Sequence, residues 1–240
     1  MSSHEGRHGI HARRPEEVHE EEGQVLSIVF STPMYGGLCT AEYFQSCLDL
    51  RGSLVKAGID HQFLVTTNES LITRARNTAV ARFMFDPDLQ RYDRFMFIDA
   101  DIEFNPEDVQ KLWNLDVDVA CAAYPMKREE AGVTAWKNGK LIDLDGFDGP
   151  TEIDFAGTGF LMIKRQVFES MMKEFPHLEH EEGKVGRCFA FFDTGVVDDG
   201  SGPYYISEDY YFCKKARKMG LQILLEPSIR LGHVGRKVYR

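Results

Sequence analysis

Two carboxylates separated by one residue follow an apolar segment near the middle of the chain: Asp99, Ala100 and Asp101 come directly after residues 94–98. Residues two apart in an extended chain share a face, so both carboxylates can point at one ligand. Mg²⁺ and Mn²⁺ are hard cations that bind one or two carboxylates together with phosphate oxygens. The pattern therefore predicts a metal and diphosphate site at Asp99 and Asp101. The alternative is an acidic turn that caps a helix beginning at Pro106.

A second acidic pair, Glu208 and Asp209, follows Ser207 at the start of a predicted helix. A carboxylate here could act as a general base that removes a proton from an acceptor hydroxyl. Asp209 is our first candidate for this base and Glu208 the second. The structural alternative is that Ser207 caps the helix and that the two acids complement the positive end of its dipole.

A late histidine, His233, stands in the segment Gly232-His233-Val234-Gly235. Glycines allow close approach of the backbone to a ligand, and neutral imidazole is a common ligand for ions such as Mn²⁺. His233 is therefore a candidate metal ligand, although a single histidine is also common as an ordinary surface or core residue.

Several cationic and polar residues are candidates for holding a nucleotide-sugar. Arg74 and Asn77 share one face of a predicted helix, with Asn68 just before it, and Lys127 follows the end of a predicted strand. Such side chains bind phosphate or sugar hydroxyls. An ordinary solvated helix face explains Arg74 and Asn77 equally well.

Two glycines, Gly157 and Gly159, interrupt the predicted strand at residues 155–163. Glycine inside a strand indicates close approach of another group or a bulge. We interpret these positions as a wall against the sugar or the acceptor, with a plain bulge as the alternative.

The predicted elements alternate between strands and helices through residue 123, which favours an α/β fold with a central, mostly parallel sheet flanked by helices. The second half is less regular, with an acidic, turn-rich stretch at 143–154 and a charged loop at 176–186. The predicted strands are 25–30, 63–66, 94–98, 117–123, 155–163 and 222–225, and the predicted helices are 40–57, 71–85, 106–115, 165–175 and 208–219.

Length and composition indicate one domain at residues 24–240 after a disordered tail at residues 1–23, which is rich in Glu, His and Arg. The formal net charge of −10 argues against a nucleic-acid-binding protein. The 5 cysteines show no metal-binding spacing, which favours reduced thiols and a cytoplasmic location. No apolar run approaches the roughly 18 residues that a membrane span needs.

Taken in order, these segments resemble the GT-A superfamily of glycosyltransferases, especially the large family 2-like group with its DxD motif. The resemblance covers residues 25–235 and rests on the order of Thr32-Pro33, residues 71–77, Asp99-Ala100-Asp101, Gly157-Thr158-Gly159, Ser207-Glu208-Asp209 and His233. It implies a Rossmann-like fold with a nucleotide-binding half at residues 24–125 and a smaller, irregular acceptor-binding half at residues 126–240.

The resemblance also implies roles for individual residues. Thr32 and Pro33 line the nucleoside pocket, and Asp99 contacts the ribose or the donor sugar. Asp101 binds Mn²⁺ or Mg²⁺, and His233 completes the metal or diphosphate site. Asp209 is the base of an inverting enzyme.

The expected function is transfer of a sugar from a nucleotide-sugar, with UDP the commonest nucleotide in the family, to a hydroxyl of a glycan or small molecule. One alternative is a nucleotidyltransferase, but such enzymes usually carry a basic, Gly-rich loop after the first strand, and residues 33–37 contain no Lys or Arg. The other alternative is a nucleotide- or sugar-binding protein without turnover. The acids at 99, 101, 208 and 209 argue against it, because binding alone needs no additional base. Oligomeric state stays open.

Overall fold

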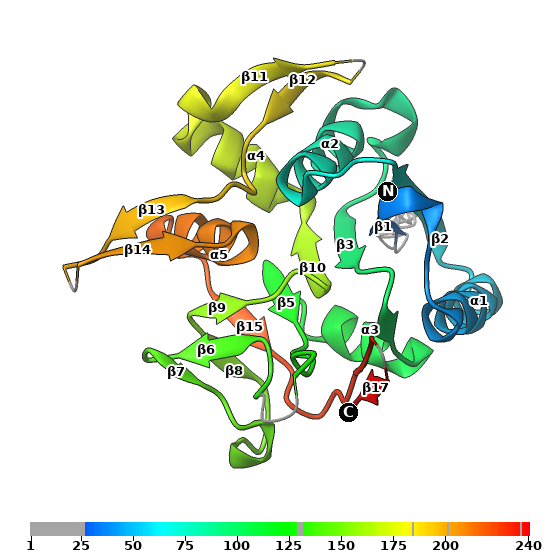
Figure 1. The fold of residues 1–240 in the computed structure, drawn as a ribbon. Coiled ribbons are helices and arrows are strands. Elements are labelled where there is room, and N and C mark those ends of the chain that lie inside the picture. Colours follow the sequence, from blue (N-terminus) through cyan, green and yellow to red (C-terminus); the bar gives the residue numbers. More distant parts are fainter. Residues whose placement is uncertain (1–26, 129–131, 184, 201, 236) are drawn as a thin grey trace, which may run out of the picture.

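The computed structural model describes residues 27–128, 132–183, 185–200, 202–235 and 237–240 (Figure 1). The predicted tail at residues 1–23 lies outside them. The described residues form an α/β structure built on one large sheet with helices on both faces (Figure 1).

The central sheet has the strand order β2-β1-β3-β10-β5-β15-β8. β2, β1, β3, β5 and β15 point the same way, whereas β10 and β8 run against them. The predicted mostly parallel sheet is thus confirmed. Its strands are β1 (Ser27–Met34), β2 (Asp60–Thr67), β3 (Arg94–Ile98), β5 (Val119–Cys121), β8 (Thr151–Ile153), β10 (Phe160–Lys164) and β15 (Ile223–Leu225).

Two hydrophobic layers cover the sheet because its strands alternate in the faces they present. On β3, Phe95 and Phe97 pack toward one side, and Met96 and Ile98 toward the other. Burying each such side chain stabilises the fold by about 2 kcal/mol. The first layer is closed by α2 (Ile72–Phe85), α4 (Arg165–Glu174) and α5 (Glu208–Lys218), and the second by α1 (Ala41–Lys56) and α3 (Pro106–Asn114).

The five predicted helices are confirmed, with ends that local chemistry explains. α1 begins after Thr40, whose hydroxyl accepts a hydrogen bond from the backbone of Tyr43 at 3.2 Å, and it ends before Gly58 at φ +67°. α3 begins at Pro106 behind a capping box in which the carboxylate of Asp108 accepts from the backbone of Asn105 at 2.9 Å.

The predicted charged loop at residues 176–186 is wrong. These residues contribute instead to a hairpin of β11 (Glu179–Glu182) and β12 (Gly186–Phe189). A second hairpin follows, formed by β13 (Gly195–Asp198) and β14 (Pro203–Ile206). Both hairpins extend outward in Figure 1. The first hairpin carries a paired Glu179 and Arg187 across its strands, at 2.9 Å. A charged ribbon of this kind lacks the apolar alternation by which strands are recognised. The turn-rich stretch at 143–154 likewise contains β8.

Two small antiparallel sheets lie beside the central one. The first joins β7 (Lys140–Leu141), β6 (Ala135–Lys137) and β9 (Phe155–Ala156); the second joins β17 (Val238–Tyr239), β16 (Gly232–Val234) and β4 (Ile102–Glu103). The second pairs His233 with Ile102, the residue after Asp101. Short 3₁₀ turns occupy Tyr35–Gly37, Pro87–Leu89, Leu144–Gly146 and Pro176–Leu178.

None of the helices among the described residues is both long and apolar enough to cross a bilayer. All 5 cysteines lie in the described part of the chain and are free thiols. Cys121, Cys188 and Cys213 are buried, whereas Cys39 is exposed.

Candidate active site

The candidate site lies at the edge of the sheet where β3 ends, which is where open α/β sheets bind ligands. Asp99 follows β3 directly, and its backbone N–H donates to the carbonyl of Gly159 at 3.0 Å, just before β10 begins. The carbonyl of Ala100 accepts from the backbone of Thr40 at 2.9 Å. These bonds hold the Asp99–Asp101 turn between the start of α1 and the reversed strand β10.

A buried arginine joins the two acidic segments. Arg76 on α2 is only 3% exposed, and its terminal nitrogens donate to both carboxylate oxygens of Asp99 at 3.0 and 3.2 Å. Its Nε lies 3.4 Å from Oε1 of Glu208. Burial alone would lower the pKa of Arg76, but the charges of Asp99 and Glu208 hold it above its ordinary value. Arg76 therefore stays charged and fixes both acids.

Asp209 has the chemistry of a general base. Burial and the neighbouring Glu208 raise its pKa to about 6, against smaller lowering effects from Ser207, Tyr210 and Arg76. The hydroxyl of Ser207 and the backbone N–H of Tyr210, at 2.8 Å, both donate to Oδ1. Among the described residues Oδ2 receives no hydrogen bond. Ser207 is the N-cap residue of α5, as predicted, but its hydroxyl serves Asp209 instead of the helix backbone.

A second cluster gathers on Asp101. Lys127 hydrogen-bonds to Oδ2 of Asp101, and Nε2 of His233 lies 3.6 Å from Oδ1. The other ring nitrogen of His233, Nδ1, lies 2.7 Å from the carbonyl of Pro125, and it must be the donor because a carbonyl only accepts. Burial works to raise the pKa of Asp101, but the hydrogen bonds from His233 and Lys127 outweigh it and hold the pKa below its usual value.

The donors at Asp101 suit a divalent ion that shares its coordination with a substrate. The described residues contain no group of three or more His, Cys, Asp or Glu side chains able to hold a metal. However, Asp101 and His233 meet, and the Pro125 carbonyl orients the imidazole in the way that outer partners orient metal-binding histidines. Mg²⁺-type ions commonly take one or two protein ligands together with substrate phosphates. Asp99 faces Arg76 instead of joining this pair.

Other predicted binding residues have partners elsewhere. Asn77 donates to the carbonyl of Phe192 at 2.8 Å and accepts from its N–H at 2.9 Å, so its amide fastens the 190–194 segment to α2. Arg74 forms a two-point pair with Glu69 at 2.7 and 2.9 Å. Asn68 is exposed, at φ 59°, in the turn after β2.

The end of β1 is predicted to face the nucleoside. Thr32 is 2% exposed, and its hydroxyl is hydrogen-bonded to that of Tyr43 at 2.5 Å. Pro33 is half-buried and pairs with Thr66 of β2. The side chain of Thr32 thus links β1 to α1 and is not available to a ligand. Only the backbone and Pro33 could line a nucleoside pocket at this end of β1.

The two glycines before β10 make room for an aromatic ring. A Cβ on Gly159 would lie 2.7 Å from Cζ of Tyr124, and a Cβ on Gly157 would meet the hydroxyl oxygen of the same tyrosine. The N–H of Gly159 donates to this hydroxyl at 3.1 Å. Burial, followed by the charges of Asp99 and Asp209, raises the pKa of Tyr124 well above its ordinary value. Tyr124 therefore lies near both carboxylates as a neutral phenol.

Arg76 and Tyr124 are site residues that the sequence analysis missed. A signal for Arg76 existed: it stands three, four and seven residues before Ala79, Val80 and Phe83, so it shares the buried stripe of α2. A charged residue in such a stripe needs a partner. Tyr124 carried no comparable signal.

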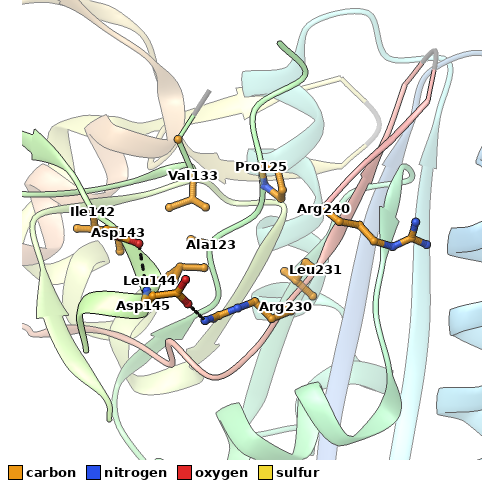
Figure 2. Close-up of a pocket in the computed structure, with 11 residues that line it drawn as sticks. Ala123, Pro125, Val133, Ile142, Asp143, Leu144, Asp145, Arg230, Leu231 and Arg240 are labelled. Carbon is orange, nitrogen blue, oxygen red and sulfur yellow. Dashed lines mark hydrogen bonds and ion pairs between the residues drawn. The ribbon is translucent and has the colours of Figure 1, made fainter. Parts of the chain in front are cut away.

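A cavity of about 400 Å³ lies next to the segment that carries Tyr124 (Figure 2). Ala123 and Pro125 line it, whereas Tyr124 between them points to the acids, because alternate residues of an extended segment face opposite ways. Arg230 and Asp145 form an ion pair at its rim. The cavity thus lies on the side of residues 123–125 that is opposite to the acids, and the Pro125 carbonyl that accepts from His233 belongs to this segment.

Neither a family model nor a curated protein matches the chain, but solved structures do. A197 from STIV aligns with a TM-score of 0.53 and 18% identity over 88% of this chain and 86% of that chain. At this identity the likeness shows a shared fold alone. A mutant of Drosophila β1,4-galactosyltransferase 7 in complex with manganese, UDP-Gal and xylobiose aligns at 0.48, with 16% identity over 88% and 71%. GalNAc-T7 with UDP, GalNAc and Mn²⁺ aligns at 0.46, with 12% identity over 90% and 45%.

Proposed function

We propose that this chain is a glycosyltransferase that moves a sugar from a nucleotide-sugar to an acceptor hydroxyl with the help of Mn²⁺ or Mg²⁺. The proposal rests on one observation: two clusters of charged residues with different partners lie at the end of β3. One is the Arg76-anchored set of Asp99 and Glu208, next to Asp209; the other is Asp101 with His233 and Lys127. A binding protein without turnover has no need of a base beside such a set.

The Asp101 cluster suits the leaving diphosphate. Asp101 and His233 would hold the ion, and Lys127 adds a positive charge beside them. When bound, the ion would stabilise the negative charge that develops on the leaving diphosphate. Asp99, held in place by Arg76, keeps lone pairs on both carboxylate oxygens and can accept hydrogen bonds from hydroxyls of the ribose or donor sugar.

The Asp209 carboxylate suits proton removal from the acceptor. The acceptor oxygen attacks the anomeric carbon while its proton passes to Oδ2 of Asp209. The bond from that carbon to the diphosphate breaks, and its electron pair leaves with the nucleoside diphosphate. This single displacement inverts the configuration. A base with a pKa of about 6 is deprotonated at neutral pH and still basic enough to assist.

The remaining assignments follow the family resemblance and are part of the proposal. They comprise UDP as the nucleotide, a glycan or small-molecule acceptor, a cytoplasmic location, which the free thiols favour, and contacts to the donor or acceptor from Thr32, Pro33, Asn68, Arg74, Asn77, Ala100, Lys127, Gly157 and Gly159.

The test is a thermal-shift screen of nucleoside diphosphates, nucleoside triphosphates and nucleotide-sugars, each with and without Mn²⁺. Ligand at a hundredfold excess over its dissociation constant stabilises the native state by about 2.7 kcal/mol. We expect one diphosphate and its sugar conjugates to raise the melting temperature only with Mn²⁺. Asp101→Asn should abolish this shift, and the exposed Asp148→Asn should keep it.

Transfer is then measured with the selected nucleotide-sugar by release of the nucleoside diphosphate, with and without glycan acceptors. A shift confined to triphosphates, with release of pyrophosphate, would favour the nucleotidyltransferase alternative. The absence of any shift at millimolar nucleotide would refute the proposed function.

A further inference from the structure

Lys127 occupies the position on Asp101 where a cation is expected. Its ammonium group contacts Oδ2, while Oδ1 of the same carboxylate faces Nε2 of His233 at 3.6 Å. Because Nδ1 of His233 donates to the carbonyl of Pro125, Nε2 is the ring nitrogen that faces Asp101. The lysine thus places a full positive charge on the carboxylate that His233 also faces.

The stem of Lys127 is seated by the hairpin that carries His233. A Cβ on Gly235 would lie 3.2 Å from Cδ of Lys127 and 3.4 Å from the ring of Tyr239, so the absence of a side chain at Gly235 makes room for the lysine. The side chains of Lys127 and Asp101 are each 34% exposed, so the ammonium end can move while the stem stays in place. Lysine is suited to such exchange because its ammonium is a compact charge on a flexible stem.

We propose that Lys127 is a stand-in cation that moves from Asp101 to the diphosphate when the metal binds, and thereby makes metal binding depend on the nucleotide. This inference rests on the proposed function. It assigns Lys127 a coupling role in addition to that of a phosphate-binding residue.

The physical reason is competition for one carboxylate. A divalent ion arriving alone must displace the ammonium of Lys127, which is then left without its anion and close to a second cation. The nucleoside diphosphate removes this penalty because its oxygens accept the ammonium and complete the coordination of the metal. Metal and nucleotide therefore bind with positive coupling, which must be equal in both directions.

The experiment measures the Mn²⁺ dissociation constant from the electron paramagnetic resonance signal of free Mn²⁺, with and without the nucleoside diphosphate. UDP, GDP, ADP and CDP are each used, and a titration without protein corrects for Mn²⁺ bound to nucleotide in solution. The coupling factor is the ratio of the two constants. The variants are Lys127→Met, which removes the charge, Lys127→Arg, which keeps it, and Lys140→Met, an exposed lysine on β7, as control.

In the unmodified protein we expect one nucleotide to tighten Mn²⁺ binding by about tenfold or more. Lys127→Met should tighten the binding of Mn²⁺ alone by several-fold, roughly, and lower the coupling factor, because the competitor is gone and only the coordination of the metal by the diphosphate still couples the two ligands. Lys127→Arg and Lys140→Met should keep the coupling.

Two results overturn the inference, and they are distinguishable. If the unmodified protein binds Mn²⁺ with a nucleotide but Lys127→Met leaves the coupling unchanged or weakens Mn²⁺ binding alone, the inference is wrong and the proposed function stands. If the unmodified protein binds no Mn²⁺ with any of the nucleotides, the proposed function and the inference are both wrong.

Discussion

Arg76 and Asp99, 23 positions apart in the sequence, form a two-point ion pair with nitrogen–oxygen distances of 3.0 and 3.2 Å. The remaining guanidinium nitrogen, Nε, lies 3.4 Å from Glu208, 132 positions along the chain. One buried side chain thereby aligns the turn after β3 with the first turn of α5. The spacing between Asp99, the proposed donor-binding acid, and Asp209, the proposed base on α5, depends on this side chain.

Arg76→Lys is expected to reduce both stability and transfer. Lysine cannot reproduce the fork of donors, so Asp99 and Glu208 lose alignment. Weakening a buried pair of this kind should lower the free energy of unfolding by about 2 kcal/mol, measured by urea denaturation. A misplacement of about 1 Å at a reacting group can cost on the order of a hundredfold in turnover.

Arg74→Lys on the same helix is the matched control for stability. Its pair with Glu69 lies at the surface, with 44% of the arginine side chain exposed, so the change should lower the free energy of unfolding much less than Arg76→Lys does. Equal losses for the two variants would contradict the role given to Arg76.

The pH dependence of transfer should report the ionisation of Asp209. The base must be deprotonated, so kcat/KM should fall as the pH drops below about 6, the pKa of this residue. The hydrogen bond from Ser207 lowers that pKa, so Ser207→Ala should move the acidic limb of the profile to higher pH. An unchanged limb in Ser207→Ala would show that another group sets it.

Asp209→Asn should change stability in a pH-dependent way. The folded state raises the pKa of Asp209 from 3.8 to about 6, so the folded state holds the proton more tightly than the unfolded chain does. The native protein therefore loses stability as the pH rises between about 4 and 6. The asparagine side chain does not ionise, so the variant does not lose stability in this way. Compared with the unmodified protein, it should be more stable at pH 8 by about 2 kcal/mol and no more stable at pH 4.

The same variant separates the base from the fold. Asp209→Asn should slow transfer by about 10²–10⁴-fold while remaining folded, as measured by circular dichroism and by turnover at pH 7.5. Turnover close to that of the native protein would instead point to Glu208 as the base.

Gly159→Ala should destabilise the protein because the new methyl group would enter the ring of Tyr124 at 2.7 Å. Overpacking of this kind costs about 1–3 kcal/mol. Gly52→Ala is the control, since nothing lies within 4 Å of that position in α1. It should raise stability by roughly 0.5–1 kcal/mol because alanine favours the helix. Thermal unfolding of both variants tests whether the two changes in stability have opposite signs.

Much of the fold could be predicted because local patterns determine it. The five helices and the strands β1, β3 and β15 stand where apolar periodicity and capping residues put them. The direction of β10 had no such signal. Its residues are apolar on both faces, and nothing local distinguishes a parallel from an antiparallel neighbour in the middle of a sheet.

The candidate site was predictable only in part. The acids at 99, 101, 208 and 209 and the histidine at 233 were visible because short polar groups interrupt apolar or glycine-rich segments. The pairing of Arg76 with Asp99 and Glu208 depends on contacts across three elements, which no local pattern records. The glycines at 157 and 159 did signal a close approach, but the approaching group, Tyr124, comes from another strand end.

The pairing of β16 with β4 has a consequence for the order in which the site is made. Val234 donates its N–H to the carbonyl of Asp101 at 2.8 Å, so two residues 133 positions apart in the sequence together form one side of the candidate site. On the ribosome, Asp99 and Asp101 emerge long before His233 is synthesised. His233 follows the end of β15 by only 8 residues (225 to 233), so the last parallel strand of the central sheet and the imidazole leave the ribosome nearly together. The proposed metal site should therefore be completed only in the last stage of translation of this segment, together with the sheet itself.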